Sequence, residues 1–132
     1  MKANELMIGD WVDFYHPYEP EKKIVTRHRV TEIFECGLVG ICNHLNPVHA
    51  DHIEPVEITP EILERNGFNR EGGASYWHEG DRDACILHWS KDKEQLIIGS
   101  PCDDCMVQMN VRYIHELQHA LRLCGIDKEI TL

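Results

Sequence analysis

The chain has 132 residues, of which 42% are hydrophobic, and a formal net charge of −10 from 23 acidic and 13 basic side chains. This length predicts one domain, or two very small lobes that share a core. The acidic balance argues against nonspecific DNA binding, which needs Lys and Arg to neutralise phosphates, and it favours solubility and a basic protein partner.

No targeting or membrane segment is visible in the sequence. The N-terminus has no apolar stretch followed by a cleavage site, so it does not resemble a signal peptide. No run approaches the ~18 consecutive apolar residues that a membrane span needs. We therefore expect a cytoplasmic protein without a membrane partner, in which the six cysteines are reduced.

The first half of the chain predicts short β-strands, because β-branched, alternating runs lie between Gly and Pro breaks. The predicted strands are Trp11–Phe14, Lys23–Glu35, Leu38–Cys42 and His52–Ile58. Pro55 places the last strand at a sheet edge, since proline cannot donate to a ladder. So many short strands in so short a stretch predict a small, bent antiparallel sheet or an SH3-like barrel.

A short helix is predicted after these strands. Thr59 is a good N-cap, and Pro60 stands at the favoured first helical position. Gly67 is a good residue to end the helix in a left-handed conformation, and Phe68 can then fold back on Leu63. The helix therefore closes the β-rich half of the chain.

A loop at residues 69–73 predicts a boundary between a β-rich lobe, residues 1–68, and a second lobe, residues 69–132, with one compact domain as the alternative. In the second lobe, alternating runs on both sides of a polar turn predict an antiparallel hairpin. These two runs are Ala84–Trp89 and Gln95–Ile98.

The clearest helix of the sequence comes last, from an N-cap at Asn110 to a terminating glycine at Gly125. Its apolar stripe consists of Ile114, Leu117, Leu121 and Cys124. We expect this stripe to cover the hairpin or sheet. The whole chain is thus predicted to be α+β: a small bent sheet or barrel, then an antiparallel hairpin or sheet under a C-terminal amphipathic helix.

The same helix contains a sequence that fits the pattern H-E-x-x-H, in which two His one turn apart bind zinc and the Glu activates the metal-bound water. On these residues the segment resembles zinc-dependent metallopeptidases of the zincin group. The resemblance implies His115 and His119 as ligands, zinc as cofactor and Glu116 as general base. No third ligand follows in the sequence, so His78 or His88 would have to supply it.

The helical periodicity favours a structural interpretation of this segment. It places His115 and His119 opposite the apolar stripe, facing solvent between Arg112 and Arg122. Two guanidinium groups beside a dication are electrostatically unfavourable. An Arg112–Glu116 pair at i,i+4 accounts for the polar face without a metal.

A second resemblance covers more of the chain. Three segments are similar to a group of small proteins of unknown function from gut anaerobic bacteria and their phages or mobile elements: MKANELMIGDWV, ITPEILERNGF and YIHELQHALRLCGI. This resemblance implies no activity and no catalytic residue. Relatives in that group often carry a His-x-Leu-Gln core without the full zinc pattern, which favours a packing role for the helix.

Two further groups contain residues of the types that bind metals. Cys102 and Cys105 form a lone C-x-x-C before the last helix, with two acidic residues between the thiols and no second pair at zinc-ribbon spacing. The other group fits no standard zinc knuckle and consists of Cys42, His44, His49 and His52. A structural or incidental role is the favoured interpretation of the Cys pair, and an edge loop that carries surface histidines is favoured for the other group.

One basic cluster stands out in the acidic chain, formed by Lys22, Lys23, Arg27 and Arg29. A small barrel can present such a cluster to nucleic acid by charge and stacking. The favoured alternative is an edge strand whose exposed charges prevent aggregation.

The sequence favours a non-enzymatic module that acts through contacts with an unknown protein partner, without a cofactor. The alternatives are a zinc-dependent hydrolase that uses the His-Glu-Leu-Gln-His segment, and a nucleic-acid-binding small barrel that uses the segment Lys22–Arg29. The oligomeric state is left open.

Overall fold

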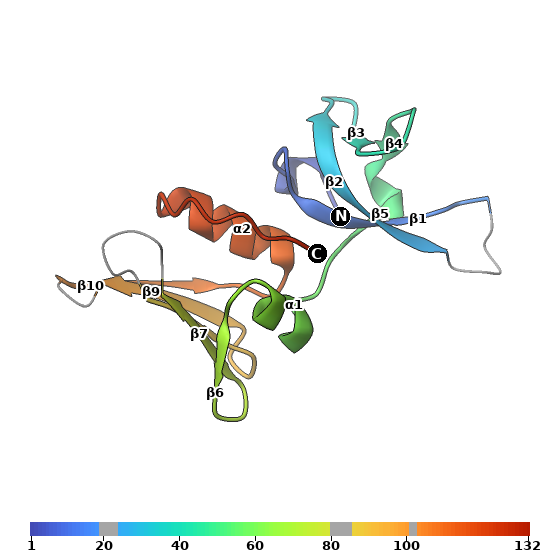
Figure 1. Ribbon diagram of the computed structural model, residues 1–132. Coiled ribbons are helices and arrows are strands. Elements are labelled where there is room, and N and C mark those ends of the chain that lie inside the picture. The colour runs from blue at the N-terminus through green and yellow to red at the C-terminus, as the bar shows by residue number, and fades with distance from the viewer. Residues whose placement is uncertain (19–23, 80–85, 101–102) are drawn as a thin grey trace. The chain divides into compact units, whose positions relative to one another are not determined.

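The computed structural model describes residues 1–18, 24–79, 86–100 and 103–132. The chain divides into two compact units, Met1–Val56 and Glu57–Leu132. The short helix after Pro60 thus belongs to the second unit, whereas the sequence placed a boundary after residue 68. The predicted α+β class is confirmed, with one five-stranded antiparallel sheet in each unit (Figure 1).

The N-terminal unit contains one antiparallel sheet in the order β4-β3-β2-β1-β5. Its strands are β1 (Trp11–Tyr15), β2 (Val25–Ile33), β3 (Leu38–Ile41), β4 (Val48–His49) and β5 (Ile53–Pro55). Two 3-10 turns, η1 (Ala3–Glu5) and η2 (Ala50–His52), complete the unit. The antiparallel sheet that the sequence predicts is confirmed, and the described strands do not close into a barrel.

Alternation along β1 builds the core of this unit. Val12 and Phe14 are buried, whereas Trp11, Asp13 and Tyr15 lie on the other face. The core also contains Val30, Val39, Ile41, Val48 and Ile53. β5, with Pro55 at its end, is an edge strand, which confirms the prediction from that proline. The two-residue strand β4 is too short for a periodic signal.

The second unit contains α1 (Pro60–Arg65), five strands in the order β10-β9-β8-β7-β6, and α2 (Ile114–Leu123). The strands are β6 (Asn69–Glu71), β7 (Ser75–Glu79), β8 (Ile86–Ser90), β9 (Gln95–Ser100) and β10 (Asp103–Asn110). Each strand pairs with its neighbour in sequence, so the sheet is a simple meander. The predicted hairpin is the pair β8 and β9.

One face of this sheet is apolar and lies along α2 (Figure 1). The cross-strand register aligns Tyr76, Trp89 and Leu96 in one row, and all three are buried. The indole Nε1 of Trp89 donates to the Val111 carbonyl at 2.9 Å, which ties the sheet to the connection that leads into α2. The predicted helix over an antiparallel sheet is confirmed.

The caps of α1 are those that the sequence predicts. Thr59 Oγ1 accepts from the Ile62 N–H at 3.3 Å, and Gly67 has φ +83°. The Phe68 N–H donates to the Leu63 carbonyl at 2.9 Å, the long bond of a Schellman ending. These signals are local, which is why the sequence alone is sufficient to place them.

The predicted start of the last helix is wrong. Asn110 ends β10 opposite Gln95, and the Val111 N–H donates to the Glu94 carbonyl at 2.8 Å, so the backbone is still extended there. α2 begins at Ile114, after an extended Tyr113. Asparagine is a favourable N-cap, but the sheet ladder provides its backbone with other partners.

Candidate functional site

The His-Glu-Leu-Gln-His segment lies in the first two turns of α2, and its predicted exposure is wrong at His115. That side chain is 6% exposed, and Gln118 is buried with it, so the buried face of α2 is wider than the predicted apolar stripe. His119 is half-buried. The His115 ring stacks on Tyr113 with centroids 5.9 Å apart and meets the His119 ring edge-on at 5.6 Å.

Glu116 acts as a helix cap in this structure. Its Oε2 accepts from the backbone N–H of Arg112 at 2.6 Å and from that of Tyr113 at 3.0 Å. These N–H groups precede the first helical hydrogen bond, and the carboxylate also stands at the positive end of the helix dipole. The residue that the zinc pattern assigns as general base is therefore engaged in closing the first turn.

The two upstream His that the sequence offers as third ligands lie on opposite faces of the second sheet. His78 is opposite Leu87, on the face that α2 covers, whereas His88 is opposite Ile97 on the other face. His78 packs against Phe68 with ring centroids 5.1 Å apart. Among the described residues, no three His, Cys, Asp or Glu side chains are arranged to hold one metal ion.

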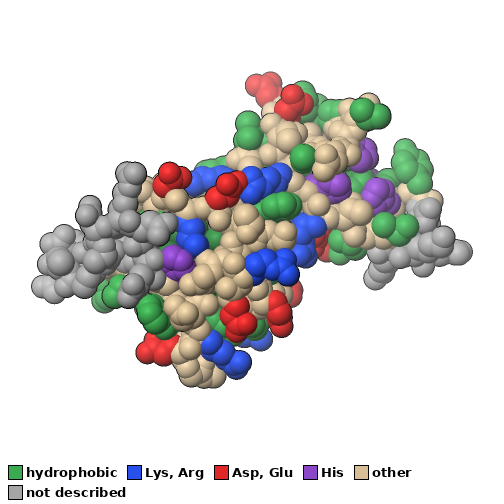
Figure 2. All heavy atoms as spheres, in the orientation of Figure 1, with side chains coloured by type: hydrophobic (Ala, Val, Ile, Leu, Met, Phe, Trp, Pro, Cys, Tyr) green, Lys and Arg blue, Asp and Glu red, His purple; other side chains and the backbone are tan. Residues whose placement is uncertain are grey.

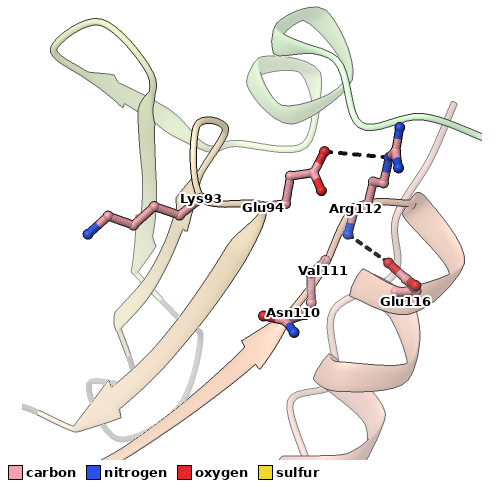
Figure 3. Close-up of a pocket in the computed structure, with 6 residues that line it drawn as sticks. All are labelled: Lys93, Glu94, Asn110, Val111, Arg112 and Glu116. Atoms are coloured by element: carbon pink, nitrogen blue, oxygen red, sulfur yellow. Dashed lines mark hydrogen bonds and ion pairs between the residues drawn. The ribbon is translucent and has the colours of Figure 1, made fainter.

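A cavity of about 270 Å³ opens beside the first turn of α2 (Figure 3). It is lined by Lys93, Glu94, Asn110, Val111, Arg112 and Glu116. Arg112 Nε lies 3.4 Å from Oε1 of Glu94, a residue of the β8–β9 turn, and Arg112 bonds Glu116 through its backbone N–H. These contacts replace the predicted pair between the Arg112 and Glu116 side chains. The residues that line the cavity carry charges of both signs.

The predicted ligand group of the N-terminal unit is spread over separate local contacts. His49 Nδ1 lies 3.2 Å from Asp51 Oδ2, and His44 Nδ1 lies 2.7 Å from the Asn46 carbonyl oxygen. Cys42 is exposed. His52 ends the 3-10 turn η2. Each imidazole bond shown here stabilises a turn.

A different set of His converges on one end of the first sheet, where Figure 2 shows His side chains gathered on the N-terminal unit. The rings of His16, His28 and His44 meet Phe14 edge-on, with centroids 4.7, 6.4 and 5.3 Å away. His16 and His28 share Phe14's face of the strand pair, because β1 and β2 alternate in register. The alternation that places His16 and His28 on this face is visible in the sequence. The third ring, that of His44, lies in a loop, and its position is not visible there.

Hydrogen bonds join two of these three His through Thr26 and set which atom donates in each bond. His28 Nδ1 lies 2.6 Å from the Cys42 carbonyl oxygen, which only accepts, so Nδ1 donates. In the neutral ring, Nε2 then accepts from Thr26 Oγ1 at 2.7 Å, and Thr26 in turn accepts from His16 Nε2 at 3.0 Å. His16, Thr26 and His28 therefore form a directed chain of hydrogen bonds beside Phe14, at the end of the apolar core.

The basic strand is neutralised or covered where the structure describes it. Arg27 makes two bonds to Asp13, at 2.8 and 3.3 Å, and the bond raises the pKa of the guanidinium. The Arg29 guanidinium lies 4.8 Å from the centre of the Trp11 ring. Lys22 and Lys23 lie outside the described residues.

The C-x-x-C pair has a different setting from the predicted one. Cys102 lies outside the described residues, and Cys105 lies within β10. Cys105 is therefore separated from α2 by the rest of β10. A thiol that is activated by a helix N-terminus needs to lie at that terminus.

The four sheet edges differ greatly in length. β4, β5 and β6 have two or three residues, whereas β10 has eight. From Met106 to Asn110, a segment here called the β10 edge, the strand pairs with β9 on one side and contains no charge and no proline. Met106 is 73% exposed and Val107 44%. Such an edge is a template for another strand.

Comparisons with models of protein families, with curated proteins and with solved structures find no match to this chain. Among the described residues, no helix has the length and apolar character that crossing a membrane requires.

Proposed function

We propose that the protein is a non-enzymatic binding module that recognises an extended segment of another protein chain by adding it as a strand to the β10 edge. The observation that carries this proposal is the contrast between β10, with eight residues, and the other three edges, with two or three. Strand addition takes its affinity from main-chain hydrogen bonds and its specificity from alternate side chains.

The side chains around the β10 edge support this use. Met106 lies on the sheet face opposite α2, because it is aligned with Gly99 and Ile86 across the strands. Ile86 is 43% exposed on β8, two strands from the edge, and Met106 and Ile86 together leave apolar surface on this face of the sheet. A strand that added here would bury part of this surface as well as satisfy the backbone, and aromatic or apolar cross-strand pairs stabilise a sheet.

A panel of capped eight-residue peptides tests the proposal. The panel alternates Val with Lys, Glu or Gln, and binding is followed by the amide NMR signals of the full chain. We expect at least one peptide to shift the β10-edge signals, and the basic peptide to bind best because the chain carries a net charge of −10. If no peptide at millimolar concentration moved those signals, strand addition would be abandoned.

Gln95 and Gln108 provide a matched pair of variants for this test. They are diagonal neighbours on β10 and β9, joined by a 2.8 Å bond between their side-chain amides, so Lys at either position breaks the same contact. Only Gln108 stands on the edge strand, where lysine discourages further pairing. Gln108→Lys is expected to weaken peptide binding, while Gln95→Lys retains most of it.

Less supports the alternative functions. For a zinc hydrolase, Glu116 would have to leave the two backbone N–H groups that it caps. For nucleic-acid binding, Arg27 would have to leave Asp13.

The resemblance to small proteins of phages and mobile elements supports two further parts of the proposal: an origin in a phage or mobile element, and a cytoplasmic location. A 3-10 turn before the last strand, together with the strand order, supports an SH3-like relationship for the N-terminal unit.

A further inference from the structure

We infer that the strand that adds to the β10 edge is β10 of a second copy of this chain, antiparallel and with the two Gln108 residues opposite each other. This inference rests on the proposed function and names its partner. In this dimer, the β10-containing sheets of the two copies join into one ten-stranded sheet around a two-fold axis.

Symmetry limits the possible registers. Directly opposite residues of an antiparallel pair point to the same face. The two-fold axis must therefore pass midway between a residue and the same residue of the second copy. With the axis at Gln108, Val107 is opposite Met109 and Met106 is opposite Asn110. This register pairs all five residues of the β10 edge, whereas an axis at Met106 leaves part of the edge without a partner.

The amide side chains are self-complementary at this axis. Gln108 Nε2 donates to Gln95 Oε1 at 2.8 Å on the sheet face opposite α2. An amide carries two N–H donors and an acceptor oxygen, so Gln108 still has groups to offer the Gln108 of a second copy. The two Gln108 amides can therefore bond each other across the axis, as stacked amides do between strands of identical sequence.

Charge complementarity favours the same arrangement. The sequence places Asp103 and Asp104 at the start of β10 and Arg112 just after its end. Antiparallel pairing brings the acidic start of one strand near the basic end of the other. The Arg112 side chain is about half exposed beside Glu94, so it remains accessible. The net charge of −10 opposes association, but distant charges are screened over roughly 8 Å at physiological salt.

The size of the contact predicts a weak dimer. Five paired residues span about 17 Å, and an interface built on them falls in the class below roughly 1,200 Å² that is typical of transient contacts. Dimerisation should therefore depend on concentration and should appear in the micromolar range or above.

Sedimentation velocity of the full chain over a concentration series, in reducing buffer, tests the inference. Reducing buffer removes any dimer held by disulfides. We expect a monomer–dimer equilibrium that Gln108→Lys abolishes and Gln95→Lys largely retains. Far-UV circular dichroism verifies that each variant folds.

Charge reversal tests the register. Arg112→Glu should weaken the dimer roughly fivefold, since two symmetry-related pairs are lost, and Asp103→Lys with Asp104→Lys should do the same. All three reversals together should restore it, because the signs are again opposite. Failure of the combined variant to recover would overturn the register. If Arg112→Glu does not fold, the Gln108 and Gln95 variants still test the inference.

The outcomes separate this inference from the proposed function. A wild-type chain that stays monomeric at all concentrations, while peptides still shift the β10-edge signals, overturns the second copy as partner and leaves strand addition standing. A dimer that Gln108→Lys does not affect uses another surface and also overturns the inference. If there is neither a dimer nor peptide binding, both proposals fall.

Discussion

The carboxylate of Glu116 accepts a hydrogen bond from the backbone N–H of Tyr113, 3.0 Å away, and this bond closes the first turn of α2. Glu116→Ala removes the acceptor and should lower the free energy of unfolding by about 1 kcal/mol, as loss of a helix cap typically does. Glu116→Gln keeps an acceptor oxygen and should cost less. Urea denaturation of the purified variants measures both effects.

The same two variants distinguish the structural role from catalysis. A general base loses its function when its carboxylate becomes an amide, whereas a cap is largely kept. Hydrolysis of peptides or esters that disappears in Glu116→Gln, with stability unchanged, would contradict the assignment of Glu116 as a cap alone.

Asn66 should be the most sensitive polar position described in the second unit. Its Nδ2 donates to the carbonyls of Ile62 and Thr131, both at 2.8 Å, and its Oδ1 accepts from the Thr131 N–H at 2.9 Å. Asn66→Ala should cost about 1–3 kcal/mol, because it removes buried partners of backbone groups. Amide hydrogen exchange should show lost protection at Thr131.

Thr131→Val is the control for that prediction, since it removes only the hydroxyl contact to Asn66 Oδ1 at 3.3 Å. A stability change within about 0.5 kcal/mol is expected. Equal losses in the two variants would show that the Asn66 amide is not what holds the C-terminal segment.

Gly67 and Gly125 end α1 and α2 in the same way, but with different surroundings. Both have positive φ, +83° and +68°, so alanine at either position should cost roughly 1–2 kcal/mol. A Cβ at Gly67 would lie 3.2 Å from His78 Nε2, whereas one at Gly125 meets nothing within 4 Å. Gly67→Ala should therefore be the more destabilising in thermal denaturation. The reverse order would contradict the close packing of His78.

The phenol of Tyr15 should titrate above its usual range. Its hydroxyl donates to Glu54 Oε2 at 2.7 Å, and this bond raises the pKa because ionisation destroys it and leaves two negative charges adjacent. Glu54→Gln should lower the pKa of Tyr15. Absorbance at alkaline pH, with Tyr15→Phe to identify the signal, measures the shift. An unchanged titration in Glu54→Gln would contradict the bond.

Local signals made α1 and β1 predictable. A capping Thr59, a terminating Gly67 and the alternation of apolar Val12 and Phe14 with their neighbours act over a few residues, and the structure confirms each. The start of α2 was mispredicted because Asn110 has a ladder partner, Gln95, fifteen positions earlier. The exposure of His115 was mispredicted for a similar reason: hydrophobic periodicity reports which residues are apolar, and a buried polar ring is invisible to it.

The sequence by itself determined the elements that arise from neighbouring residues: an acidic α+β chain, its short strands, and a C-terminal helix with an apolar stripe. Only the tertiary structure decided that β10 lies at an edge and which rings meet. Strand order places β10 beside β9 alone, and a loop brings His44 to Phe14 from thirty residues away. The edge position of β10 and the contact of His44 with Phe14 both depend on how distant segments come together. A short window of sequence carries no signal for that.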